Sequence, residues 1–89
     1  MPKQKTKDGK RNLIGQRLRE LRIQYGLSQR ALARKLQLRG YDMEKNIITR
    51  IENDQRFVTD IELKALVEVF GIDYDFLIDG KINDERKGW

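Results

Sequence analysis

Two segments near the middle of this 89-residue chain constrain its fold more than any other feature. They are GLSQRALARKL at residues 26–36 and IITRIEN at residues 47–53. In the first, Ser28 is a residue type that caps helices, and it follows closely on a glycine that can end a preceding helix. In the second, Ile48 and Ile51 fall on one face of a short helix, with polar side chains on another face. The sequence therefore predicts two consecutive helices joined by a connector.

A helical stripe precedes the first segment. Its apolar residues are spaced at i, i+4, i+7 and i+11, and they are Ile14, Leu18, Leu21 and Tyr25. We expect this helix to begin at Asn12, which can serve as its N-cap, and to end at Gly26. The next helix is expected from Gln29 to about Leu38, because Ser28 precedes it as a cap.

Three more helices are expected after the connector. The first of them is predicted from Met43 or Glu44 to Asn53, with Asp42 available as its cap. The fourth helix is predicted to start at the capping box of Thr59 and Glu62 and to end at Gly71. The fifth is predicted between its cap Asp73 and Gly80. The chain thus predicts five short helices in all.

Five short helices without strand-like alternation predict an all-α domain, which we expect to occupy residues 12–80. Residues 1–11 hold five basic residues and almost nothing apolar, and they are predicted to be a disordered basic arm. Such an arm can contact nucleic-acid phosphates or can serve only as a solubilising tail. Residues 81–89 are expected to form a polar C-terminal tail.

The composition excludes several classes of chemistry. The chain has no cysteine and no histidine, so it offers neither a thiolate nor an imidazole to a metal or to catalysis. Its acidic residues do not follow a calcium-loop spacing. We therefore expect no enzyme, no cofactor, no metal site and no small-molecule ligand. No apolar run approaches the roughly 20 residues that span a bilayer, and no signal peptide is evident, so a cytoplasmic protein is expected.

Charge is distributed unevenly along the chain, whose net charge is +5. Residues 1–39 carry 12 lysines and arginines against 2 acidic residues, whereas residues 59–89 carry 4 against 8. One half is therefore suited to meet a polyanion, although a solvated surface that is simply uneven would have the same composition.

These motifs resemble the helix-turn-helix of lambda-repressor-like proteins, also called the Cro or XRE type. The resemblance covers residues 13 to about 80 and rests on motifs such as Gly26-Leu27-Ser28-Gln29, Leu32-Ala33 and Ile48-Thr49-Arg50-Ile51-Glu52-Asn53. It implies a five-helix DNA-binding domain in which the second and third helices form the helix-turn-helix. Ala33 lies where that family places a small side chain between closely packed helices. Glu52 is expected to pair with Arg22 in a partly buried ion pair that fixes the third helix against the first.

The resemblance also implies which residues meet DNA. Base-reading side chains are expected on the first turns of the third helix, at Lys45, Asn46, Thr49 and Arg50. Phosphate contacts are expected from the start of the second helix and the loop after the third, at Ser28, Gln29, Arg30 and Arg56. Some of these side chains can instead have a purely structural function within the domain. Thr49 can bond its own helix backbone, and Arg50 can pair with Glu44 or Asp54.

One departure from the family concerns the connector QLRGYDM, residues 37–43, which is longer than the usual turn of roughly 3–4 residues. Gly40 supplies a backbone break within it. Because of the extra length, the start of the third helix can shift by a residue. That shift affects the assignment of base-reading residues more than it affects the fold.

The resemblance implies a sequence-specific regulator of transcription, a repressor that binds double-stranded DNA as a homodimer on a palindromic operator, with no membrane association. The two reading helices would then lie about 34 Å apart. Dimer contacts are expected from apolar residues near the C-terminus, which are Phe76, Leu77, Ile78, Ile82 and Trp89. The alternative is a protein-interaction helix-turn-helix module of antitoxin or coactivator type, whose acidic C-terminal third would bind a basic partner.

Overall fold

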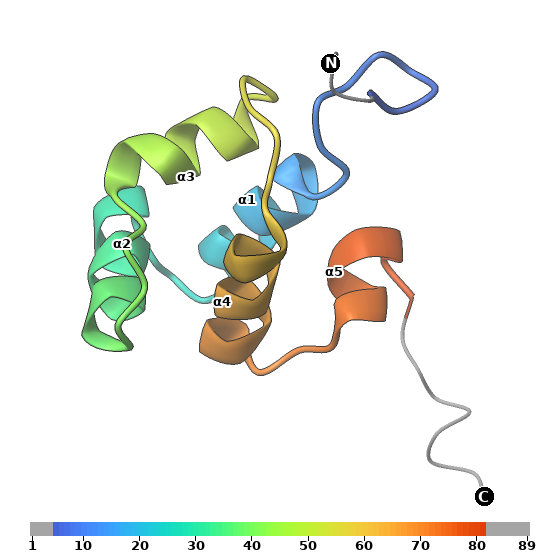
Figure 1. The fold of residues 1–89 in the computed structure, drawn as a ribbon. Coiled ribbons are helices and arrows are strands. Elements are labelled where there is room, and N and C mark those ends of the chain that lie inside the picture. The colour runs from blue at the N-terminus through green and yellow to red at the C-terminus, as the bar shows by residue number, and fades with distance from the viewer. Residues whose placement is uncertain (1–4, 82–89) are drawn as a thin grey trace, which may run out of the picture.

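The structure is a computed structural model that describes residues 5–81 of the chain. Within those residues it contains five helices and no strand, so the predicted all-α fold is confirmed (Figure 1). In chain order the helices are α1 (Gly15–Gln24), α2 (Gln29–Leu38), α3 (Lys45–Glu52), α4 (Asp60–Phe70) and α5 (Tyr74–Asp79). α3 packs against α2 and α1, while α4 packs against α2 and α5.

One hydrophobic core holds these helices together. Its largest fully buried side chains are Ile14, Leu18, Leu32, Leu36, Ile48, Ile51, Leu66 and Leu77. Burying an apolar side chain of this size contributes about 1.5–3 kcal/mol relative to leaving it in water. Ala33 is also buried, on the helix that packs against both α3 and α4. The core therefore fixes α3 from its inner side.

The helix ends follow local signals in the sequence. Ser28 Oγ accepts a hydrogen bond from Ala31 N at 3.0 Å, which confirms Ser28 as the cap of α2. Thr59 Oγ1 accepts from Glu62 N at 3.1 Å and Glu62 Oε1 accepts from Thr59 N at 2.9 Å, which confirms the capping box. Asp73 caps α5 as predicted. These bonds satisfy N–H groups that have no partner inside their helices.

Two helices begin later than the sequence predicted. α1 starts at Gly15 rather than Asn12, and Ile14 occupies its N-cap position, but Asn12 Oδ1 still accepts hydrogen bonds from Ile14 N at 3.1 Å and Gly15 N at 2.8 Å, as a capping asparagine does. α3 starts at Lys45, and Asp42 is not its cap. Glu44 occupies the N-cap position in extended backbone and makes no side-chain capping bond.

Tertiary contacts hold the connector between α2 and α3. Met43 is only 2% exposed, and its carbonyl accepts from Gln37 Nε2 at 3.3 Å. Tyr41 Oη donates to Glu68 Oε1 on α4 at 2.7 Å, and this hydrogen bond is the main cause of a raised pKa of Tyr41. The connector therefore stays non-helical as far as Glu44, which explains the late start of α3.

Residues 5–11, the described part of the predicted arm, make hydrogen bonds within the segment and to the turn after α3. Lys10 N donates to Thr6 Oγ1 at 2.9 Å, which closes a turn. Arg11 N donates to Asp54 Oδ1 at 2.7 Å and so attaches the segment beside the end of α3 (Figure 1). The second bond has no local signature, because it joins residues 43 positions apart. The remainder of the arm lies outside the described residues.

The structure corrects the predicted dimer surface near the C-terminus. Leu77 is fully buried, so the prediction that it contacts a second copy is wrong. Phe76 and Ile78 are half-buried and pack against the core, because α5 turns this side toward α4. Ile82 and Trp89, with most of the predicted tail, lie outside the described residues. None of the described helices combines the length and apolar character that a bilayer crossing requires.

Candidate nucleic-acid interface

α3 has one apolar side and one polar side. Ile48 and Ile51 are fully buried on the inner side. The exposed residues of the other side are Lys45, Asn46 and Arg50. Positions i, i+1, i+4 and i+5 share one side of a helix, so these side chains project from a single surface with the half-buried Thr49 among them. The structure thus brings the four predicted base-reading residues together on the outer side of α3.

The three exposed side chains of this surface have no partner within the described part of the domain. Lys45, Asn46 and Arg50 make no side-chain hydrogen bond or ion pair there. Arg50 in particular pairs with neither Glu44 nor Asp54. Their hydrogen-bonding groups are therefore directed to water in the free protein and are available to a ligand.

Thr49 and Gln29 are bonded to each other. Thr49 Oγ1 lies 2.7 Å from Gln29 Oε1 and 3.0 Å from Lys45 O, and its one hydrogen can be donated to either oxygen. Gln29 Nε2 donates to Glu52 Oε1 at 3.0 Å and keeps a second N–H free of that bond. A chain of polar groups therefore connects the start of α2 to α3 and orients Gln29.

Arg22 and Glu52 lie in direct contact between α1 and α3. Arg22 Nε donates to Glu52 Oε2 at 2.7 Å and Nη2 donates to Oε1 at 3.1 Å, while Nη1 donates to Leu27 O at 2.9 Å. The side chains of the pair are only 13% and 2% exposed. Hydrogen bonding to Glu52 raises the pKa of Arg22 despite the opposing effect of burial. The pair thus links α1, the turn before α2 and the end of α3.

The remaining predicted phosphate-binding residues lie in two places. Ser28 and Arg30 are exposed at the start of α2, where the first backbone N–H groups have no helical partners. Arg56 lies in the loop before α4, and its Nη1 donates to Glu62 Oε2 at 2.7 Å. The charge of Arg56 is therefore partly neutralised inside the domain, whereas that of Arg30 is not.

A joint that the sequence did not reveal connects α1 to the end of α3. Asn12 Nδ2 donates to Ile51 O at 3.1 Å and to Arg56 O at 3.0 Å. Gly15 lies so close to Ile51 O that a Cβ at this position would overlap it. These contacts join residues about 40 positions apart, so no local pattern announces them. They hold the back of α3 against α1.

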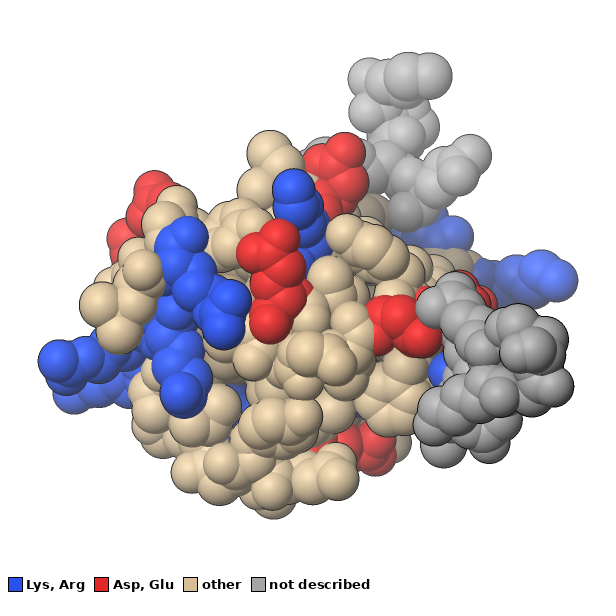
Figure 2. All heavy atoms as spheres, turned by 90° about the horizontal axis from the view of Figure 1, so that it is seen from below, with Lys and Arg blue, Asp and Glu red and all other residues tan. Residues whose placement is uncertain are grey.

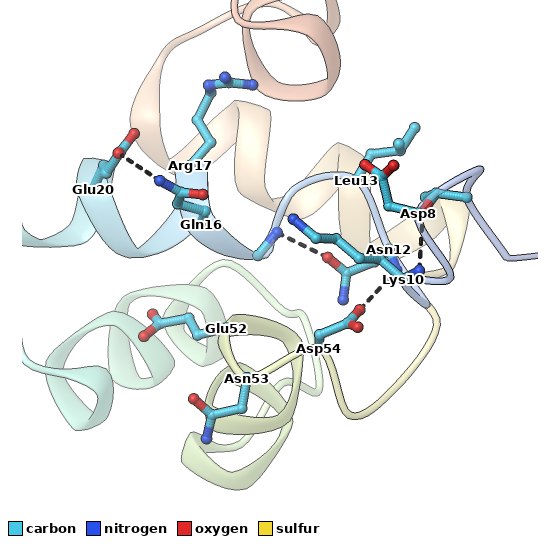
Figure 3. Close-up of a pocket in the computed structure, with 12 residues that line it drawn as sticks. Asp8, Lys10, Asn12, Leu13, Gln16, Arg17, Glu20, Glu52, Asn53 and Asp54 are labelled. Atoms are coloured by element: carbon cyan, nitrogen blue, oxygen red, sulfur yellow. Dashed lines mark hydrogen bonds between the residues drawn. The ribbon is translucent and has the colours of Figure 1, made fainter.

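A groove of about 500 Å³ lies beside this joint (Figure 3). Its charged lining includes the acidic side chains Asp8, Glu20, Glu52 and Asp54 and the basic side chains Lys10 and Arg17. The excess of carboxylates makes this groove a poor site for a polyanion. Within the described residues no three acidic side chains converge to hold a metal ion. The outer side of α3 is therefore the better candidate interface.

Asn53 extends the polar surface of α3, although it is not among the four residues predicted to read bases. It is the exposed C-cap of the helix, four residues beyond Thr49 and eight beyond Lys45. That spacing places it on the same side as both residues. The four-residue period from Lys45 was the signal that could have identified it.

Basic side chains line the exposed side of α2, the helix next to α3. The view from below shows a group of basic side chains on the side of α2, while acidic side chains and a few further basic ones are spread over the rest of this face (Figure 2). The exposed basic residues of α2 and its C-cap are Arg30, Arg34, Lys35 and Arg39. The basic residues that are concentrated in the N-terminal half of the sequence are thus also concentrated on one side of the folded domain.

Comparison with known proteins agrees with this architecture. The helix-turn-helix domain family matches residues 15–81, a range that includes all five helices. The chain is also 38% identical over 63 residues to the HTH-type transcriptional regulator RamB of Mycobacterium tuberculosis, from strains CDC 1551 / Oshkosh and H37Rv. This similarity covers 71% of the chain and 12% of the length of each relative. No solved structure gives a significant match. The chain belongs to the Cro/XRE-type helix-turn-helix domain family.

Proposed function

We propose that this protein is a sequence-specific double-stranded DNA-binding regulator of transcription that reads the major groove with α3. The proposal is carried by the outer side of α3, where Lys45, Asn46 and Arg50 are exposed without partners in the described domain. The inner side of the same helix is fixed in the core. A rigid helix with free hydrogen-bonding groups suits the major groove, which is wide enough to admit an α-helix.

The residue types on this surface match the donors and acceptors of base edges. The Asn46 amide can form a two-bond contact with adenine, and Arg50 or Lys45 can donate to guanine. A good two-bond contact is worth about 1–3 kcal/mol of discrimination against the wrong base. Thr49 is held by Gln29 and offers its methyl group to thymine or its hydroxyl to a neighbouring acceptor.

Phosphate binding is proposed at the start of α2. Free backbone N–H groups and the positive end of the helix dipole favour an anion beside Ser28 and Gln29, and Arg30 adds positive charge. Arg56 is a weaker candidate, because binding phosphate would compete with its ion pair to Glu62. These contacts would set the orientation of the domain on DNA, while α3 supplies sequence preference.

We further propose that the protein acts in the cytoplasm as a repressor and as a homodimer on a palindromic operator. α3 has only eight residues, so one copy contacts few base pairs. A second copy one helical turn of DNA away, about 34 Å, would double the contacts. A domain that occupies the major groove at a promoter excludes other proteins from it, which favours repression. The similar protein RamB is named a transcriptional regulator, which supports a regulatory function.

Selection of bound duplexes from random DNA tests this function. We expect the protein to enrich a palindromic sequence and to bind it at least about 1,000-fold more tightly than random duplex. Arg50→Ala should relax the preference at one or two positions of each half-site, by about 1–3 kcal/mol, and leave other positions unchanged. Lys64→Ala is the matched control, because Lys64 is an exposed basic residue on α4 rather than α3.

Three other results would count against parts of this proposal. A selected site without repeated half-sites would contradict the homodimer. Equal affinity for all sequences would contradict base reading. Failure to bind any duplex at low salt would contradict DNA binding and favour the protein-interaction module.

A further inference from the structure

We propose that Arg11 and Gln55 bind a phosphate of the DNA backbone beside the base that Arg50 reads, and that Asp54 positions Arg11 for this contact. The inference rests on the DNA-binding function proposed above and adds one binding site to it. Arg11, Arg50 and Gln55 line a hollow of about 420 Å³ at the C-terminal end of α3. A phosphate group fits in such a hollow, and guanidinium groups are well matched to phosphate oxygens.

Arg11 is fixed in place although it is exposed. Its backbone N donates to Asp54 Oδ1 at 2.7 Å, and its Nη1 donates to Asp54 O at 3.3 Å. The guanidinium has five N–H donors, so this contact leaves most of them for an anion. The segment before α1 therefore presents an oriented arginine at the end of α3 rather than a free one.

Asp54 is suited to hold this segment. Its φ of 58° lies in the left-handed region, which aspartate tolerates better than most residues with a side chain. In this conformation Oδ1 accepts from Arg11 N and also from Asn12 N at 3.2 Å. One carboxylate oxygen thus binds two consecutive backbone N–H groups and fastens the N-terminal segment to the turn after α3.

Gln55 supplies the third wall of the hollow. Its backbone N donates to Arg50 O at 2.7 Å, which closes the turn directly after α3. Its exposed side chain lines the hollow with Arg11 and Arg50, and its amide offers two further N–H donors. The hollow thus adjoins the surface on which Arg50 lies, so a phosphate in it would flank the base that Arg50 contacts.

Binding to a labelled duplex of random sequence, measured by fluorescence anisotropy between about 50 and 200 mM salt, tests the phosphate contact. We expect Arg11→Ala to weaken binding roughly tenfold, the value of one charge-assisted hydrogen bond. The slope of log affinity against log salt should fall by about 0.9, the loss of one phosphate contact. Arg39→Ala, at the end of α2 that lies lowest in Figure 1, is the matched control and should change the slope by less than half as much.

Replacing Asp54 tests whether it positions Arg11, because the two possible explanations predict opposite changes in DNA affinity. Asp54→Gly removes a negative charge beside a polyanion, and this alone would tighten binding. Loss of the hydrogen bonds from Arg11 N and Asn12 N to Oδ1 frees the segment that carries Arg11, and this predicts the opposite, a loss of affinity close to that of Arg11→Ala. The double variant should then bind no more weakly than Arg11→Ala alone. Asp54→Asn keeps an oxygen acceptor and should bind at least as well as the natural sequence.

The possible outcomes separate this site from the function on which it rests. Equal salt slopes for Arg11→Ala and Arg39→Ala would overturn the phosphate site, and tighter binding by Asp54→Gly would overturn the positioning by Asp54. Circular dichroism checks that each variant is folded, and Arg11→Ala and Asp54→Asn decide the question if Asp54→Gly is not. Failure of the unaltered protein to bind random duplex at low salt would overturn the DNA-binding function and this site together.

Discussion

Replacing Gly15 with alanine should destabilise the domain by about 2–3 kcal/mol, although alanine normally favours a helix. Gly15 is the first residue of α1, where helix propensity alone predicts a gain of up to about 1 kcal/mol. A Cβ at this position would overlap Ile51 O, a backbone atom at the end of α3. A backbone atom cannot rotate away as a flexible side chain can, so α1 and α3 would have to separate.

Thermal unfolding followed by circular dichroism measures this effect. We expect Gly15→Ala to lower Tm by about 10–20 °C, given roughly 4–8 °C per kcal/mol in a domain of this size. Gly26→Ala is the control, because Gly26 has a φ of 69° but no atom within 4 Å of an added Cβ. Gly26→Ala should lower the free energy of unfolding only by the cost of placing alanine in left-handed backbone, about 1 kcal/mol. An unchanged or higher Tm for Gly15→Ala would contradict the close approach of the two helices.

Removing either member of the Arg22–Glu52 pair should cost about 3–5 kcal/mol of unfolding free energy. Both side chains are nearly buried, so loss of one leaves the other charged and without its partner in a poorly solvated place. Glu52→Ala also removes the acceptor of Gln29 Nε2. The effect should therefore exceed that of a surface ion pair, which is worth about 0–1 kcal/mol.

A double-mutant cycle in urea tests whether the two residues act together. We expect Arg22→Ala and Glu52→Ala to be strongly non-additive, with the double variant less unstable than the sum of the two losses. Arg22→Lys and Glu52→Gln provide a milder cycle if an alanine variant is unfolded. If both cycles are additive within about 0.5 kcal/mol, the two side chains do not stabilise the domain through their contact.

The features that were predictable from sequence depend on residues close together in the chain. Ser28 and Thr59 act through bonds to residues three positions later, so their helix starts could be assigned from sequence alone. The buried pair Ile48 and Ile51 follows from helical spacing. These local signals are sufficient to predict five helices and to place the outer side of α3 in water.

The features that sequence reasoning missed depend on distant parts of the chain. The start of α3 is set by the burial of Met43 and by the contact of Tyr41 with Glu68 on α4. The hydrogen bonds of Asp54 to the N-terminal segment span more than 40 residues, so the composition of that segment does not predict them. Such contacts exist only after the helices have packed, and helical periodicity contains no information about them.

The central claim, that the outer side of α3 contacts DNA, is tested most directly by NMR. Nitrogen-15-labelled protein would be titrated with the selected duplex while backbone and side-chain amide signals are followed. We expect the largest shifts at the Asn46 side chain and at the backbone of Arg50, Ser28 and Gln29, with small shifts at Lys64 on α4. Saturable binding that shifts α4 and α5 and leaves α3 unchanged would contradict the claim.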